Sequence, residues 1–204
     1  MDLTHADFKY TLYPYQSLYV EYVVQHRLCP QKLRAGAGQV YIHLDTGQGK
    51  TIVGLALVAR LRVPTCVVVP TLELQDTGVK RAMEALPKLR VVAYSNALAR
   101  KHEKKGKPAL NAANVDVMFI VINTARTKPP EFYHGFGMII LDEASEYHSP
   151  TSSAILWNAQ APCLVGLSAT PHERTDKMDR VVSMFLGNPL SLEEGIPSDV
   201  IDKF

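Results

Sequence analysis

The stretch LDTGQGKT, residues 44–51, combines the side chains and the backbone freedom needed to hold a chain of phosphates. Gly47 and Gly49 carry no Cβ, so the backbone N–H groups of a nest that begins at Thr46 can turn inward onto phosphate oxygens. Lys50 can reach the β- and γ-phosphates, and the hydroxyl of Thr51 can bind Mg²⁺. The sequence therefore predicts a nucleotide-binding loop formed by Thr46, Gly47, Gln48, Gly49, Lys50 and Thr51.

This loop departs from the general phosphate-loop pattern GxxxxGK[ST], because Leu44 occupies the place of the first glycine. Many nucleotide kinases and GTPases carry that glycine, whereas the shorter form TGxGKT is frequent in helicases. An alternative interpretation is a glycine turn that binds nothing. The context favours a nucleotide, since a strand is expected to end at Leu44 and a helix to begin near Lys50, where the helix N-terminus adds partial positive charge.

A second candidate group is the acidic pair in MIILDEAS, residues 138–145. Four apolar residues predict a strand, and Asp142 at its end can hold Mg²⁺ directly or through water. Glu143 can orient and deprotonate the attacking water. The alternative is a pair of surface acids that cap the following helix. In combination with the phosphate loop, the pair predicts Lys50, Asp142 and Glu143 as catalytic residues and Thr51 and Asp142 as metal ligands.

The elements that must position these groups alternate along the chain. Short runs rich in Val and Ile, without polar alternation, predict strands buried on both faces, at 40–44, 65–69, 89–94, 115–122, 138–141 and 163–168. Helical patterns occupy 16–28, 51–62 and 72–86. The alternation predicts an α/β fold, a doubly wound and mostly parallel sheet flanked by helices. The basic run at 100–108 is expected to be a loop that either contacts nucleic acid or is simply solvated.

The bulk composition narrows the class of protein without identifying it. The 204 residues allow one α/β domain or two very small ones, and the net charge of +2 is too small to indicate nucleic acid by itself. Three cysteines with no CxxC pair disfavour a disulfide framework and a zinc site, which predicts a reducing intracellular setting, in cytoplasm or nucleus. No secretory signal or long apolar run is visible, so no membrane partner is expected.

With a third motif, these residues resemble superfamily 2 helicases and translocases. A strand is expected to end in SATP, residues 168–171. By itself this string could be a Ser/Thr turn before a helix. In the superfamily, however, an SAT motif follows the DExx box and links the ATP site to the nucleic-acid site. The resemblance therefore implies a coupling role for Ser168, Ala169 and Thr170.

Smaller strings resemble the group of XPB-like, UvsW-like and type III restriction translocases. YPYQ, residues 13–16, resembles an element whose glutamine reads adenine, which implies that role for Gln16. VVVPTLELQ and VINTAR resemble two motifs that contact the nucleic-acid backbone, which implies contacts from Pro70, Thr71, Asn123 and Thr124. SATPHERTDKMD resembles the group's SATPxRxDG extension, with Arg174 and Asp176 aligned and Lys177 in place of the glycine.

Three longer strings resemble helicases of large cytoplasmic DNA viruses, including the poxvirus-type transcript-release DNA helicases. HLxTGxGKT, INTxRxKP and LDEAxExHSP match residues 43–51, 122–129 and 141–150. The resemblance implies a RecA-like P-loop domain over 36–204, preceded by a flanking segment over 1–35 that carries the glutamine motif. It also implies ATP and Mg²⁺ as cofactors, nucleic acid as partner with DNA expected rather than RNA, and host cytoplasm or virion as location for a viral protein.

Such helicases have two RecA-like domains, and the second supplies an arginine finger. No QxxGRxxR string occurs in the sequence, so the chain is expected to hold the first domain only and to hydrolyse ATP weakly without the second.

Ser145 stands where a histidine is common, which puts its coupling to the SAT motif in question. Two alternatives stay open. One is another P-loop NTPase, although NKxD is absent, and the other is an inactive nucleic-acid-binding scaffold, although the residues of the phosphate loop and acidic pair are intact.

Overall fold

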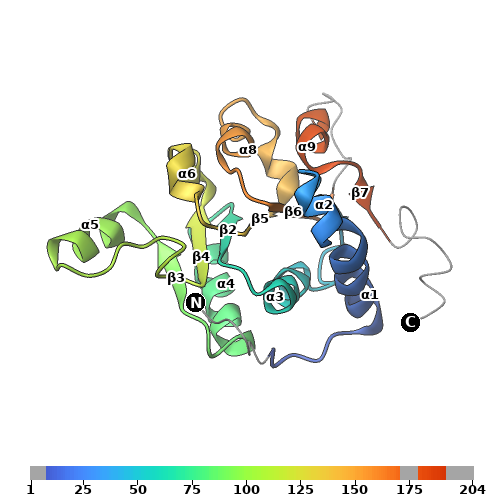
Figure 1. The fold of residues 1–204 in the computed structure, drawn as a ribbon, viewed down its shortest axis with the longest axis horizontal. Coiled ribbons are helices and arrows are strands. Elements are labelled where there is room, and N and C mark those ends of the chain that lie inside the picture. Colours follow the sequence, from blue (N-terminus) through green and yellow to red (C-terminus); the bar gives the residue numbers. More distant parts are fainter. Residues whose placement is uncertain (1–7, 171–178, 192–204) are drawn as a thin grey trace.

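The computed structural model describes residues 8–170 and 179–191 of the chain. Within these ranges, the centre is one sheet of seven parallel strands in the order β3-β4-β2-β5-β6-β1-β7 (Figure 1). The strands are β1 (Gln39–His43), β2 (Thr65–Val69), β3 (Val91–Tyr94), β4 (Val117–Val121), β5 (Met138–Asp142), β6 (Cys163–Ser168) and β7 (Pro189–Leu190). The predicted α/β fold with a doubly wound sheet is confirmed.

The strands form where the sequence offers apolar runs without polar alternation. Every residue of β2, β4 and β6 is buried, as expected for strands that helices cover on both faces. The predicted ranges 65–69 and 163–168 coincide with β2 and β6, and the other four predicted strands differ by one or two residues at their ends. β7 was not predicted, because two residues give no periodicity.

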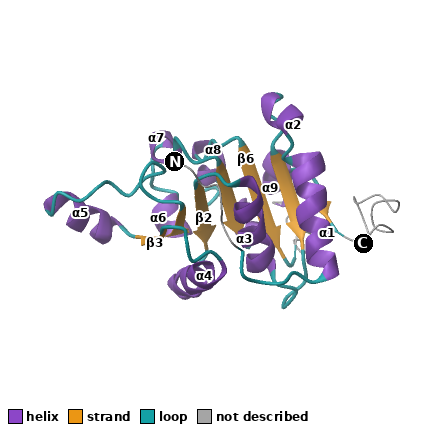
Figure 2. Cartoon of the chain, turned by 60° about the horizontal axis from the view of Figure 1, so that its bottom comes forward, coloured by secondary structure: helices purple, strands orange, loops and turns teal. Residues whose placement is uncertain are grey.

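Helices cover both faces of the sheet (Figure 2). One face packs against α1 (Pro14–Tyr22), the π-helical turn η1 (Val23–Arg27), α3 (Lys50–Leu61) and α4 (Leu72–Ala85). The other face packs against α6 (Ile122–Ala125), α7 (Pro130–Tyr133), the 3₁₀ turn η2 (Ala144–His148), α8 (Ala154–Asn158) and α9 (Asp179–Leu186). Leu18 and Val20 of α1 are buried in the first of these cores, so the described part of the N-terminal flanking segment packs into the same domain.

One predicted loop is wrong. The basic run at 100–108 is helical over its first half, because it continues α5 (Asn96–Lys104). Ser95 caps this helix, since its Oγ accepts a hydrogen bond from the backbone N–H of Leu98 at 3.1 Å. The prediction gave weight to the breakers Gly106 and Pro108 and overlooked the cap. A further short helix, α2 (Pro30–Arg34), precedes β1.

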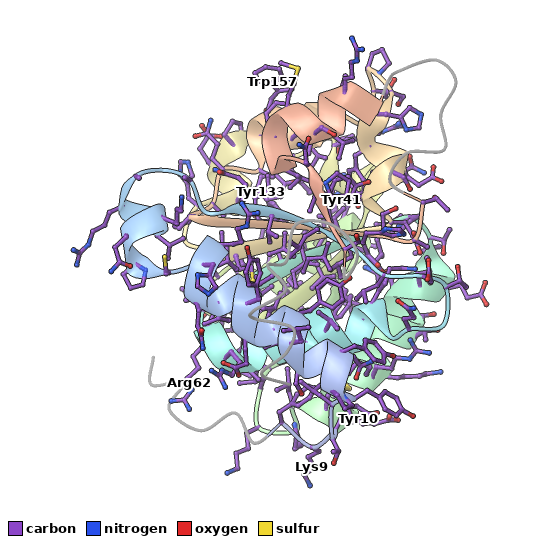
Figure 3. The ribbon with its side chains drawn as sticks, turned by 90° about the vertical axis from the view of Figure 1, so that its right-hand side faces the viewer. Lys9, Tyr10, Tyr41, Arg62, Tyr133 and Trp157 are labelled. Atoms are coloured by element: carbon purple, nitrogen blue, oxygen red, sulfur yellow. The ribbon has the colours of Figure 1, made fainter. Side chains whose placement is uncertain are left out.

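Large aromatic side chains fill the interior. Tyr41 and Tyr133 are fully buried and lie within the molecule, whereas Trp157 projects at its periphery (Figure 3). Tyr133 donates its hydroxyl to the backbone oxygen of Ala125 at 2.7 Å. Among the described residues, no buried side-chain nitrogen or oxygen lacks a hydrogen-bond partner. None of the helices in these ranges is long and apolar enough to cross a membrane.

The parallel arrangement places the carboxyl ends of the strands at one edge of the sheet. His43 pairs with Ser168 in the register of β1 and β6, and Val69 pairs with Val121 in the register of β2 and β4. The segments that leave each pair of strands therefore begin side by side. Ligands of open α/β sheets bind outside this edge. A binding site is therefore expected among the residues that follow these strands.

Candidate nucleotide and nucleic-acid site

The phosphate loop leaves β1 and ends in α3. Leu44 is buried directly after the strand, and its N–H donates to the backbone oxygen of Ser168 at 3.0 Å. Gly47 and Gly49 adopt φ values of +86° and +81°, in the left-handed region that glycine enters without strain. Gly49 is also the N-cap of α3, so the partial positive charge of the helix N-terminus adds to that of Lys50.

Two side chains fasten the loop from within. Gln48 Oε1 accepts a hydrogen bond from the backbone N–H of Asp45 at 2.9 Å, and Gln48 Nε2 donates to Asp45 Oδ2 at 3.1 Å. The backbone N–H of Gln48 also donates to the Asp45 carbonyl, at 3.1 Å. Gln48 therefore shapes the loop through Asp45. Neither Gln48 nor the exposed Thr46 lines the hollow described below, and their contacts with a nucleotide stay predictions.

The predicted adenine reader, Gln16, is fixed against the phosphate loop. Its Oε1 accepts from the backbone N–H of Tyr13 at 3.0 Å, and its Nε2 donates to the Gln48 carbonyl at 2.9 Å. Tyr15 donates its hydroxyl to the same carbonyl at 3.1 Å. An amide nitrogen carries two hydrogens, so one N–H of Gln16 remains to meet a base. A side chain at Gly49 would disturb this contact, because a Cβ there would lie 2.5 Å from Gln16 Nε2.

The three predicted catalytic side chains come together beside the loop. Lys50 Nζ lies 3.3 Å from Glu143 Oε1, and the Lys50 side chain is only 11% exposed. Burial, followed by the neighbouring Glu143 carboxylate, raises the pKa of Asp142 to about 6, and the charge of Lys50 acts in the opposite direction. The backbone N–H of Glu143 also donates to Asp142 Oδ1 at 3.2 Å. Two acids and one lysine thus share a partly buried space, where their interactions are strong.

Glu143 has an unusual backbone conformation. Its φ and ψ are +49° and +57°, a left-handed geometry that costs a residue with a side chain on the order of 1 kcal/mol or more. This turn ends β5 and leads into η2, and it keeps the Glu143 carboxylate within reach of Lys50. Strain that persists in a folded chain clusters at functional sites, because surrounding contacts must hold it. Nothing in the residues DEAS indicates this conformation.

A hollow of about 620 Å³ opens over these groups. Besides the predicted residues, it is lined by Tyr10, Thr11, Tyr13, Ile52, Leu74 and Arg81. Tyr13 is 65% exposed and presents a ring beside Gln16, and Tyr10 lies at the periphery of the molecule below α1 (Figure 3). Arg81 reaches the hollow from α4, and its charge also opposes the rise in the pKa of Asp142. These six residues were not predicted, although the position of Tyr13 within YPYQ was a usable signal.

The SAT residues join the ends of three strands. Ser168 is fully buried, donates its hydroxyl to Ser145 Oγ at 3.1 Å, and accepts from the Thr170 backbone N–H at 3.1 Å. The ring nitrogen His43 Nε2 lies 3.0 Å from the carbonyl oxygen of Ala169. The question raised by the DEAS sequence has a structural answer, because Ser145 contacts the SAT motif through its hydroxyl. This contact between His43, at the end of β1, and the SAT motif was not predicted.

The predicted nucleic-acid contacts follow β2 and β4, at the paired ends of these strands. Pro70 and Thr71 come directly after β2, while Asn123 and Thr124 lie in α6 directly after β4. Thr71 and Asn123 are exposed, and Pro70 and Thr124 are half-buried. The Oγ1 atom of Thr71 caps α4 as an acceptor, which leaves the hydroxyl hydrogen to donate. The two segments form one surface, and their binding to nucleic acid stays a prediction.

The donor set beside the loop fits Mg²⁺ bound together with a nucleotide. Thr51, in the first turn of α3, and Asp142, at the end of β5, both line the hollow. A hydroxyl and a carboxylate are hard oxygen ligands, which Mg²⁺ prefers alongside phosphate oxygens and water. Among the described residues, no group of three or more His, Cys, Asp or Glu side chains could hold a metal ion. Mg²⁺ would therefore depend on the nucleotide for part of its ligands.

Comparison with known proteins agrees with this geometry. The family model described as "Type III restriction enzyme, res subunit" matches residues 9–173. The chain is 38% identical over 181 residues to "Putative ATP-dependent RNA helicase QP509L" of African swine fever virus (strain Badajoz 1971 Vero-adapted). That alignment covers 89% of this chain and 33% of the relative, so the chain spans about a third of the length of the curated relatives it matches first.

Two solved structures share the fold. One is "Sulfolobus solfataricus SWI2/SNF2 ATPase core in complex with dsDNA", with a TM-score of 0.70 and 17% identity, over 92% of this chain and 39% of that one. The other is the UvsW helicase from bacteriophage T4, with a TM-score of 0.58 and 16% identity, over 90% of this chain and 69% of that one. At these identities the likeness concerns the fold, which is the RecA-like fold predicted from the motifs.

The family match extends through most of the described chain and includes the phosphate loop, the acidic pair and the SAT residues. Arg174 and Asp176, which occupy the Arg and Asp positions of the SATPxRxDG extension, lie outside the described residues. The strand order, the shared edge and the meeting of Lys50 with the two acids are those expected of a RecA-like ATPase. The chain belongs to the family of the type III restriction enzyme res subunit and is a motor domain of the superfamily 2 helicase type.

Proposed function

We propose that this chain binds and hydrolyses ATP and couples hydrolysis to movement along nucleic acid or to its unwinding. The observation that carries the proposal is the meeting of Lys50 with Asp142 and Glu143 in one hollow. The hollow and the predicted nucleic-acid residues lie at the same edge of the sheet, where Ser145 of the DEAS string accepts a hydrogen bond from Ser168 of the SAT motif. A half-buried lysine beside two acids is an arrangement typical of functional sites, which favours an ATPase over a scaffold.

The nucleotide would enter between α1 and the phosphate loop. One N–H of Gln16 and the ring of Tyr13 are available to the base, while the loop and Lys50 receive the phosphates. A triphosphate competes with Glu143 for the ammonium of Lys50, and its binding would release the Glu143 carboxylate to accept a proton from the attacking water. Thr51 and Asp142 would hold Mg²⁺, which neutralises phosphate charge when bound.

We further propose that a second RecA-like domain completes the ATPase in the full-length protein. The relatives matched first are about three times as long as the aligned region, which leaves room for such a domain. In related phosphoryl transfer, an added arginine raises the rate by about 10³–10⁵-fold. The chain alone is therefore expected to bind MgATP while hydrolysing it slowly.

DNA is the proposed substrate rather than RNA. Support comes from the resemblance of the motifs to those of viral DNA helicases, and the SWI2/SNF2 structure is named as a complex with double-stranded DNA. The name of the African swine fever virus relative mentions RNA instead. Binding measurements should therefore include both polymers in the same sequence and buffer.

The decisive test is a titration of the chain with ATP and GTP in the presence of Mg²⁺, with Lys50→Ala alongside. ATP is expected to bind and the variant to lose that binding, because the ammonium is the main charged contact with the phosphates. A preference for GTP would support another class of P-loop NTPase. Binding of nucleic acid with no nucleotide binding at all would support the scaffold interpretation and overturn the proposal.

A further inference from the structure

A second hollow lies at the other end of the sheet. It has a volume of about 570 Å³ and is lined by Tyr94, Asn96, Ala99, Arg100, Glu103, Lys107, Ala109, Leu110 and Phe132. β3 is the edge strand of the described sheet, and α5 projects away from the body of the molecule beside it (Figure 1). Volumes of this size accommodate small ligands or single units of a polymer. Arg100, Glu103 and Lys107 of this lining belong to the basic run at 100–108, for which the sequence left open a contact with nucleic acid or a solvated surface.

Lys128 lies beside this hollow, where three residues of the lining hold its ammonium. Its Nζ donates to Tyr94 Oη at 2.9 Å and to Asn96 Oδ1 at 2.6 Å, and both partners line the hollow. The same ammonium lies 4.7 Å from the centre of the Tyr94 ring and 5.1 Å from that of Phe132. The two rings meet edge to face at 5.0 Å, which holds them in place.

The backbone of Lys128 is also held. Its N–H donates to the carbonyl of Ala125 at 2.9 Å, and its carbonyl accepts from Asn158 Nδ2 at 3.2 Å. A lysine side chain usually loses much conformational entropy when it is fixed by a ligand. The Lys128 side chain is already held in the free protein, so ligand binding costs it little further entropy. Preorganised charges of this kind contribute more to binding than mobile surface lysines do.

The charge around Lys128 is not balanced within the described part of the chain. All its side-chain partners are neutral, and none of the ion pairs formed by described residues includes it. An ammonium has three hydrogens, so a third donor remains after the two hydrogen bonds. Arg100 and Lys107 add two cations to the lining, against the single acid Glu103. The hollow therefore favours an anion.

The position of the hollow indicates which anion. Lys128 lies four residues after Thr124, beyond the end of α6, and it belongs to the INTxRxKP string, of which only Asn123 and Thr124 are predicted to contact nucleic acid. Tyr94 and Asn96 flank the carboxyl end of β3, which pairs with β4 in parallel. The hollow thus lies on the same edge of the sheet as Thr71 and Thr124. A polymer that crosses those two threonines would meet Lys128 next.

We propose that the hollow between α5 and Phe132 binds a backbone phosphate of the nucleic-acid strand, with Lys128, Arg100 and Lys107 as its cationic contacts. The proposal rests on the proposed function, and it adds a binding site beyond the contacts implied by Thr71 and Thr124. Contacts to phosphate carry no sequence information. The hollow would fix the path of the strand, and it would bind DNA and RNA of the same length similarly.

The test uses fluorescence anisotropy with labelled single strands of about 16 nucleotides, one of DNA and one of RNA. The chain is compared with the pair Arg100→Ala/Lys107→Ala and with the matched control Lys104→Ala/Lys105→Ala. The control removes the same charge from neighbouring exposed positions that do not line the hollow. The first pair is expected to weaken binding about tenfold and to lower the salt slope by about 0.7, the value for one phosphate of a single strand, whereas the control changes either value little.

Lys128→Gln provides an independent arm. Glutamine keeps a polar donor near Tyr94 and Asn96 but removes the charge, so a weakening of about threefold to fivefold is expected, together with a small fall in melting temperature from the lost ring contacts. Lys128→Arg should recover most of the affinity. MgATP binding is measured in parallel and should stay within about twofold of the parent chain in every variant.

The outcomes separate this inference from the proposed function. If the parent chain binds strands and the lining pair loses no more affinity than the control pair, the hollow is not a nucleic-acid site, although the proposed function stands. If the lining variants lose affinity only for a labelled poly-glutamate peptide, the hollow serves an acidic protein partner and the inference is overturned. If the parent chain binds neither DNA nor RNA in low salt, the nucleic-acid part of the proposed function fails together with this site.

Discussion

Two lysines show how differently the two ends of the sheet are built. Lys50, beside the phosphate loop, is 11% exposed and forms an ion pair with Glu143 at 3.3 Å. Lys128, beside β3, is held by two neutral oxygens and two aromatic rings. At the nucleotide site, a bound phosphate must displace Glu143 from Lys50, because the two already form an ion pair. At the β3 hollow, positive charge exceeds negative charge, so a phosphate can bind without displacing an acid. The first arrangement suits catalysis, and the second suits binding alone.

The largest expected effect separates the two ends. Lys50→Ala should weaken MgATP binding by about 100-fold, because it removes a charged contact with the phosphates and leaves two acids without a partner. Affinity for a single strand should change less than about twofold, since the variant lies away from the β3 edge. Isothermal titration with ATP and anisotropy with an oligonucleotide measure the two quantities.

Lys80→Ala serves as the control for that experiment. Lys80 is exposed on α4 and does not line either hollow, so both affinities should match those of the parent chain. Lys128→Gln should show the opposite pattern to Lys50→Ala. Equal losses of both affinities in either variant would mean that the two hollows act as a single site, which would contradict their separate roles.

The next largest effect concerns the two glycines of the phosphate loop. Gly49→Ala should lower the free energy of unfolding by about 2–4 kcal/mol, because it combines a strained φ of +81° with a Cβ placed 2.5 Å from Gln16 Nε2. Gly47→Ala meets the strain alone, since no atom lies within 4 Å of its Cβ, and should cost about 1 kcal/mol. Urea unfolding of both variants tests the order, and equal losses would show that the contact with Gln16 carries no energy.

Asp142→Asn should stabilise the chain and, on the proposed function, abolish ATP hydrolysis. The pKa of Asp142 is raised by burial and by Glu143, from 3.8 to about 6, so ionisation destabilises the folded state progressively between these values and fully above them. Asparagine avoids that cost, and the gain should reach about 1–3 kcal/mol at pH 8. Unfolding without nucleotide at pH 8 and near pH 4 measures it, and the gain should vanish at the lower pH. If Asp142→Asn raises the free energy of unfolding equally at pH 8 and pH 4, the burial of a charged carboxylate is not the cause of the gain.

The smallest expected effect lies in the link between the acidic motif and the SAT motif. Ser145→Ala removes the acceptor for the buried hydroxyl of Ser168 and should cost about 1 kcal/mol. Ser183→Ala on α9, whose half-buried side chain forms no hydrogen bond with another described residue, is the matched control and should be close to neutral. A double-mutant cycle with Ser168→Ala isolates the pair. A coupling free energy near zero would show that the DEAS serine merely fills space.

The same contrast explains what could be predicted from the sequence. TCVVV and CLVGLS predicted β2 and β6 to the residue, because burial on both faces leaves no polar position to confuse the pattern. The residues at the nucleotide end, such as Lys50 and Asp142, lie in short strings directly after strands. A parallel sheet brings such strings to one edge whatever their distance in the chain. Motif and fold together were therefore sufficient to place them.

The residues that sequence reasoning missed reach their places by long-range packing. Arg81 lies in the middle of α4, and only the packing of that helix against the sheet brings it to the nucleotide hollow. Lys128 depends on Tyr94 and Phe132, which belong to separate elements. The left-handed backbone of Glu143 has no signature in DEAS. The basic run at 100–108 was assigned as a loop because the cap at Ser95 lies outside it.

The hydrogen bonds between Asp45 and Gln48 have a consequence for the history of the family. One joins the two side chains, and the other joins the Gln48 side-chain oxygen to the backbone N–H of Asp45, which any residue except proline supplies at that position. A substitution at Asp45 therefore breaks one bond, whereas a substitution at Gln48 breaks both. Homologues should vary more at position 45 than at position 48, even though neither residue belongs to the glycine-lysine signature.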